Sequence, residues 1–150
     1  MKAVIEGHRI RRSITIDAPR EKVWAAVTEP EGIAQWFGDQ ARFDALEVGA
    51  EGLFIWDGYG EFPVLITEIT PMDVFAYRWA NAPGATPPLT DSDSTLVTFT
   101  LEDDGDATVL TVVETGFESL AGGTALRRRR LDENREGWDS ELDELAALFS

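Results

Sequence analysis

The sequence contains no cysteine and only one histidine, His8. The absence of thiols excludes disulfide frameworks, cysteine nucleophiles and zinc–cysteine sites. A metal site would then need clustered carboxylates, but the acidic stretches DSD (91–93) and DDGD (103–106) fit turn chemistry and do not continue as calcium-binding loops. We therefore expect neither a metal nor a cofactor, and we expect His8 to lie at the surface, in a charged tail before the first strand.

Positive charge is scarce, since 13 Lys and Arg residues face 28 Asp and Glu residues and the net charge is −15. A surface of this sign repels nucleic-acid phosphates and anionic lipids, which argues against nucleic-acid binding. Long apolar runs are also missing, and none reaches the roughly 18 residues of a membrane helix. We expect a cytoplasmic protein without membrane insertion. The sequence does not indicate its oligomeric state.

The remaining pattern predicts a single α+β domain over residues 1–150. Residues 9–17 alternate with a period of two, with Ile10, Ile14 and Ile16 on one face, which predicts a half-buried strand. Pro19 and Pro30 each open a short helix, the second of which ends near residues 36–38. Six to seven strands are expected in all, and those after the two helices are 53–57, 62–70, 74–79, 94–102 and 108–117.

A long helix closes the chain at about 123–149. Its apolar residues recur at helical spacing, which places them on one stripe that we expect to cover a sheet face. Those residues are Leu131, Trp138, Leu142, Leu145 and Phe149. Four consecutive arginines, 127–130, begin this helix and point around most of its circumference. Ion pairs with nearby acids are the expected role, and a docking patch for an acidic partner is the alternative.

Aromatic residues are abundant, with five tryptophans and eight phenylalanines in 150 residues. Bulky rings gathered between a curved sheet and a helix pack irregularly. They either fill the core or leave an apolar cavity that suits a hydrophobic small molecule. The sequence leaves both alternatives open.

Four stretches carry a family resemblance: residues 18–38, 60–79, 94–117 and 137–149. In order and spacing they resemble the single-domain relatives of the activator of 90 kDa heat shock protein ATPase homologue, within the START-like superfamily. The resemblance implies a helix-grip fold, in which the sheet grips the C-terminal helix over a pocket. The additional domain and the Asn-rich segment through which eukaryotic activators act on the chaperone have no counterpart in this sequence.

The resemblance also implies a set of ligand-binding residues on the sheet, on the last strands and on the C-terminal helix. That set is Trp36, Phe37, Phe54, Trp56, Phe75, Tyr77, Trp79, Phe99, Val112, Glu114, Trp138 and Leu142.

Glu114 is the most distinctive acid of this set. It shares strand parity with Leu110 and Val112, so a buried face would place a carboxylate in an apolar cavity and raise its pKa. The alternative is a wet position at the rim. Glu114 and Tyr77 are the weak candidates for catalytic residues.

Three functions follow from these observations. We expect a noncatalytic protein that binds a hydrophobic or lipid-like small molecule. The first alternative is a stress-response or co-chaperone protein that binds a protein partner. The second alternative is an enzyme of the cyclase or hydrolase kind.

Overall fold

The computed structural model describes residues 2–150, which form one antiparallel sheet and three α-helices. Two helices, α1 (Arg20–Thr28) and α2 (Pro30–Ile33), follow the second strand, and α3 (Thr124–Ala147) ends the chain after a short 3-10 turn, η1 (Phe117–Ser119). The strands are β1 (Val4–Glu6), β2 (Arg9–Ile16), β3 (Gln40–Phe43), β4 (Glu51–Trp56), β5 (Gly60–Thr70), β6 (Val74–Ala80), β7 (Ser94–Asp104) and β8 (Ala107–Thr115).

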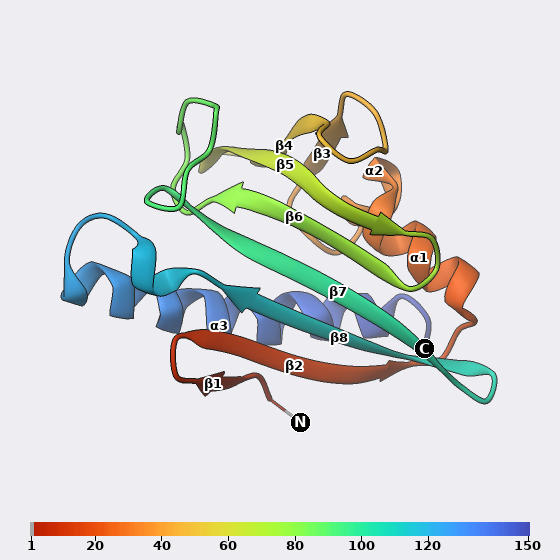
Figure 1. Cartoon of the computed structure of the whole chain (residues 1–150). Helices are drawn as coiled ribbons and strands as arrows, with labels where there is room; N and C mark the ends of the chain where they lie inside the picture. Colours follow the sequence, from red (N-terminus) through yellow and green to blue (C-terminus); the bar gives the residue numbers. More distant parts are fainter. Residues whose placement is uncertain (1) are drawn as a thin grey trace.

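The sheet has one simple topology, with the strand order β1-β2-β8-β7-β6-β5-β4-β3. The chain leaves β2, passes through α1 and α2 to the far edge, and then returns strand by strand until β8 pairs with β2 (Figure 1). Every pairing is antiparallel, and short turns join several neighbours, such as β5 to β6 and β7 to β8. This meander forms the curved sheet of the helix-grip fold, which confirms the expected α+β class.

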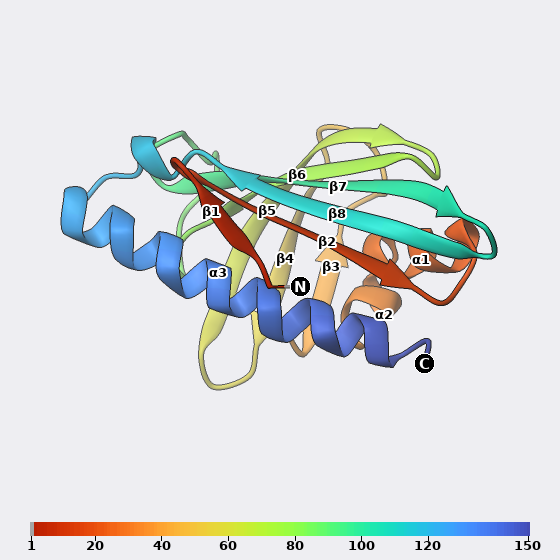
Figure 2. The same cartoon turned by 90° about the horizontal axis from the view of Figure 1, so that it is seen from below.

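Helix α3 runs across one face of the sheet, while α1 and α2 lie at one end of it (Figure 2). The predicted stripe of α3 faces the sheet, because Leu131, Trp138, Leu142 and Leu145 are buried. Opposite them lie the inward side chains of the strands, including the fully buried Phe54, Phe75 and Phe99. A single core between sheet and helix results.

The sheet has eight strands, whereas the sequence predicted six to seven. The prediction missed the two short edge strands, β1 and β3. Each has only three or four residues, which is too short for an alternating pattern to be recognised. The prediction of a charged tail before the first strand is therefore wrong. His8 is exposed, as expected, but it lies in the turn between β1 and β2, beside Gly7 with a φ of 65°.

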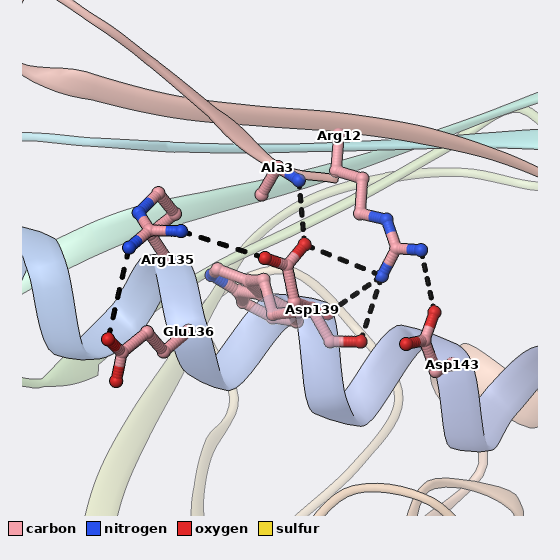
Figure 3. A network of polar contacts seen from close by, with 7 residues as sticks. Ala3, Arg12, Arg135, Glu136, Asp139 and Asp143 are labelled. Atoms are coloured by element: carbon pink, nitrogen blue, oxygen red, sulfur yellow. Dashed lines mark hydrogen bonds and ion pairs between the residues drawn. The ribbon is translucent and has the colours of Figure 1, made fainter. Parts of the chain in front are cut away.

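A polar cluster, which we call the clasp, fastens α3 to β1 and β2 (Figure 3). It consists of Ala3, Arg12, Asp139 and Asp143. The backbone N–H of Ala3 donates to Asp139 at 2.6 Å, and the Arg12 guanidinium donates to the Asp139 carbonyl at 2.9 Å and to the Asp143 carboxylate at 2.6 Å. Arg12 is 7% exposed and shares the strand parity of Ile10. The clasp therefore fixes the position of α3 along the sheet.

Candidate functional site

The centre of the candidate site is Glu114, near the end of β8. It is 0% exposed, and so are Leu110 and Val112 on the same face of the strand. Of the two positions that the sequence left open for this carboxylate, the structure has the buried face and not the wet rim. Its neighbour across the sheet is Ile10 of β2, so the environment is apolar except for the side chains that bond to it.

Four side chains from three elements donate hydrogen bonds to Glu114. Trp138 of α3 donates its indole N–H to Oε1 at 2.8 Å, and Trp79 of β6 donates its indole N–H to Oε2 at 2.9 Å. Thr95 of β7 and Asn134 of α3 complete the set, with donor distances of 2.5 Å and 3.0 Å to Oε2. Both carboxylate oxygens are occupied, so Glu114 joins the helix to the sheet.

Burial raises the pKa of Glu114, and the donors Thr95, Trp79, Trp138 and Asn134 oppose this rise because they stabilise the charged form. The same environment acts on Tyr77, which is 2% exposed. Burial, and secondarily the negative charge of Glu114, raises the pKa of the Tyr77 hydroxyl well above its ordinary value. Tyr77 therefore stays protonated at neutral pH.

A cavity of about 340 Å³ opens beside this carboxylate, between α3, the β4–β5 turn and the start of the loop after β6. Its walls carry six aromatic rings, and Trp79 and Trp138 belong both to these walls and to the partners of Glu114. The lining residues are Phe37, Trp56, Tyr59, Phe62, Trp79, Ala80, Asn81, Ala82, Pro83, Arg130, Glu133, Asn134, Gly137, Trp138 and Glu141.

The rings form one continuous wall. Phe37 lies 5.1 Å from Trp56, 5.5 Å from Trp79 and 5.4 Å from Trp138, measured between ring centroids. Phe62 continues the wall from Trp56 at 5.2 Å, and Tyr59 stacks on Phe62 at 6.2 Å. Tyr59 is 72% exposed, so it marks the open end of the cavity.

The loop after β6 is fastened to the rim of the cavity. The backbone N–H of Gly84 donates to the Glu61 carbonyl at 2.9 Å. A Cβ on Gly60 would lie 2.3 Å from the Cβ of Pro83, and Gly60 has a φ of 151°. Only glycine permits this close approach between the β4–β5 turn and the loop.

Helix α3 contributes a polar strip to the cavity. Arg130 and Glu133 pair with each other at 3.0 Å, whereas the carboxylate of Glu141 forms no ion pair or hydrogen bond with another side chain within residues 2–150. Burial, together with the nearby charge of Glu144, raises the pKa of Glu141 to about 7. The Arg130 Nε is buried and has no hydrogen-bond partner in the same part of the chain.

The ligand-binding residues implied by the resemblance divide into two groups in the structure. Phe37, Trp56, Trp79 and Trp138 line the cavity, and Glu114 lies behind two of them. The others are buried in the core and do not line this cavity: they are Trp36, Phe54, Phe75, Tyr77, Phe99, Val112 and Leu142. Trp36, for example, donates its indole N–H to the Ala26 carbonyl at 2.8 Å.

Several lining residues were not selected from the sequence. Asn134, Gly137 and Glu141 recur at spacings of three and four on α3, beside the apolar stripe, so helical periodicity could have found them. Tyr59 lies in the β4–β5 turn and Phe62 lies in β5, and no local pattern distinguishes them from ordinary turn and strand residues.

The other charged motifs have local partners. Arg128 pairs with Asp132 at 3.5 Å and Arg130 pairs with Glu133, which agrees with the ion-pair interpretation for two of the four arginines, whereas Arg127 donates to the Leu120 carbonyl. Within residues 2–150, no group of three or more His, Asp or Glu side chains is placed to hold a metal ion. No helix in that range is long and apolar enough to cross a membrane.

Comparison with known proteins gives a family match over most of the chain. The model of the family described as "Activator of Hsp90 ATPase homolog 1-like protein" matches residues 17–150. No curated protein sequence matches the chain significantly.

Solved structures share the fold. Protein MLL2253 from Mesorhizobium loti has a TM-score of 0.74 and 24% identity, with 93% of this chain and 95% of that chain covered. The Aha1 protein from Colwellia psychrerythraea, solved as a dimer, has a TM-score of 0.71 and 19% identity, with 94% and 95% covered. DynU16, from the dynemicin biosynthetic locus, has a TM-score of 0.72 and 26% identity, with 95% of this chain but only 47% of DynU16 covered.

Proposed function

The chain belongs to the Activator of Hsp90 ATPase homolog 1-like family, and we propose that it is a small-molecule-binding protein that holds an apolar ligand between the sheet and α3. The cavity of about 340 Å³ with six aromatic rings carries this proposal. Cavities of this size, mostly apolar and with a few polar groups, are typical of ligand sites. Burial of the ligand would supply the affinity, at roughly 25 cal/mol per Å² of apolar surface.

Gly137 supports the same proposal. It lies inside α3, where glycine costs about 0.5–1 kcal/mol relative to alanine. A Cβ at this position would meet no atom within 4 Å, so neighbouring side chains do not require the glycine. The residue lines the cavity, and the space above it is available to a ligand.

Glu114 has a positioning role in this proposal. Its two oxygens each accept a hydrogen bond from one indole, that of Trp79 or that of Trp138, and both indoles are cavity walls. A general base needs an accessible lone pair, whereas four donors already occupy this carboxylate. We therefore favour a binding protein over a cyclase or hydrolase that would use Glu114 and Tyr77.

The test is native mass spectrometry of the freshly purified protein, followed by organic extraction of any adduct. We expect a stoichiometric lipophilic adduct on the wild-type protein and on Gly137→Ala, and none on Gly137→Leu, whose side chain would fill the cavity. Gly137→Ala is the matched control, because it changes the same position with little volume. An apo mass for all three proteins, with no thermal stabilisation by lipophilic compounds, would contradict the proposal.

A second candidate, binding to a protein partner, is favoured by the family description, which names activators of a chaperone ATPase. With a net charge of −15, such binding would depend on charged contacts and weaken at high salt. Capture of a purified chaperone by wild type and Gly137→Leu alike would support it, because a surface interaction does not use the cavity. The cytoplasm stays our expected location for either function.

A further inference from the structure

The charge of the cavity lining is unbalanced. Three charged side chains line it, and two of them, Arg130 and Glu133, neutralise each other at 3.0 Å. The third, Glu141, is half-buried, and its carboxylate forms no ion pair or hydrogen bond with other side chains among residues 2–150. A carboxylate in an apolar site without a cation is unfavourable, so a ligand that brought one would be stabilised.

The other walls suit the same chemistry. Six aromatic rings line the cavity, and Trp56, Phe62 and Trp79 contact one another at centroid distances of 5.2 to 6.1 Å. The face of an aromatic ring carries negative electrostatic potential, and tryptophan attracts cations most strongly. An ammonium group therefore finds favourable contacts on these walls as well as at Glu141.

The net charge of the protein also favours a cationic ligand. A net charge of −15 attracts cations to the surface and repels anions. The pKa of Glu141, raised to about 7 by burial and by Glu144, shows that the site disfavours an isolated negative charge. A bound cation would reverse that penalty.

We propose that the ligand of this cavity is an amphiphilic amine, with its apolar body against the aromatic walls and its ammonium group paired with Glu141. This inference rests on the proposed small-molecule function and specifies the ligand class. One feature would favour an anionic ligand instead of an amine: the buried Nε of Arg130, which could donate to a carboxylate or carbonyl. Arg130 is already paired with Glu133, however, and an anion would also meet Glu141 and the overall negative charge.

The experiment compares three compounds that share one apolar body: 2-naphthylmethylamine, 2-naphthylmethanol and 2-naphthoate. Their dissociation constants are measured by isothermal titration calorimetry at about pH 8, where Glu141 is ionised and the amine is still protonated. Indole N–H signals in ¹⁵N-labelled protein locate the binding, because Trp56 lines the cavity and Trp24 does not.

We expect the amine to bind about tenfold more tightly than the alcohol, and the alcohol more tightly than 2-naphthoate. Glu141→Gln should remove most of the preference for the amine, so that the amine and the alcohol bind with similar dissociation constants. Glu136→Gln is the matched control, since it removes one exposed negative charge from the same helix outside the cavity and should preserve the preference.

The outcomes separate the two proposals. Equal binding of amine and alcohol, or tightest binding of 2-naphthoate, would overturn the amine inference and leave the small-molecule function standing. Loss of the preference in Glu136→Gln as well as Glu141→Gln would also overturn it, since overall charge would then be the cause. If none of the three compounds bound or shifted the Trp56 signal, both proposals would fail.

Discussion

The indole nitrogen of Trp138 lies 2.8 Å from Oε1 of Glu114 and joins the middle of α3 to the last strand of the sheet. Trp79 reaches the other oxygen from β6 at 2.9 Å. One buried carboxylate thus holds two of the aromatic walls of the cavity. A change at Glu114 should therefore be detected both in stability and in the two indole environments.

Glu114→Gln should destabilise the protein by about 2–4 kcal/mol. The amide NH₂ would face indole, hydroxyl and amide donors, so at least one buried donor loses its acceptor. Urea unfolding measures the loss, and the indole N–H signals of Trp79 and Trp138 should shift. Unchanged stability would show that the hydrogen bonds to Glu114 contribute no net free energy.

Two substitutions of Trp138 test how much its packing and its hydrogen bond to Glu114 stabilise the protein. Trp138→Ala should cost about 3–5 kcal/mol, since the residue is 2% exposed and contacts Phe37 and Phe99. Trp138→Phe keeps one aromatic ring but loses the indole N–H and part of the ring volume, so a smaller loss of about 1–2 kcal/mol is expected. Urea unfolding measures both losses of free energy. A loss below about 1 kcal/mol for the alanine variant would indicate that the side chain lines an open site without supporting the core.

The raised pKa of Glu141 predicts how the stability of the protein depends on pH. Its pKa is raised from 4.5 to about 7 in the folded state, so the folded protein binds this proton more tightly than the unfolded chain does. The free energy of unfolding of the wild type, relative to Glu141→Gln, should therefore fall as the pH rises from about 4.5 to about 7.

Urea unfolding of both proteins at several pH values measures this difference, in which the other carboxylates cancel. A flat difference across that range would contradict the raised pKa.

Arg12, in the clasp, should contribute more to the free energy of unfolding than its neighbour on the strand, Arg11. Arg12→Met should destabilise the protein by about 3 kcal/mol, because it leaves the nearly buried Asp139 and two helix carbonyls without the guanidinium. Arg11→Met is the matched control on the exposed face of β2, and about 0.5 kcal/mol or less is expected. Equal losses in urea unfolding would show that the clasp does not stabilise α3.

Local sequence patterns were sufficient to predict most of the helices and strands. The alternation in β2 and the helical stripe through Trp138 predicted their buried faces correctly, because side-chain direction is fixed by a period of two or of 3.6. The alternation in β8 put Glu114 on one face with Leu110 and Val112 but left open whether that face is buried, which the structure decides. Arg12 falls on the same parity as Ile10, and it was overlooked because a buried arginine is expected only where a partner is already known.

The sequence by itself determined the α+β class, the order of the main elements and the residues that face inward, since these depend on neighbours along the chain. Only the tertiary structure decided which inward residues become cavity walls. Phe75 and Trp79 share one face of β6, yet Phe75 is fully buried in the core and Trp79 borders the cavity. That difference depends on the position of α3 along the sheet, which is set by contacts such as those of Glu114 and Arg12 with residues more than 20 positions away.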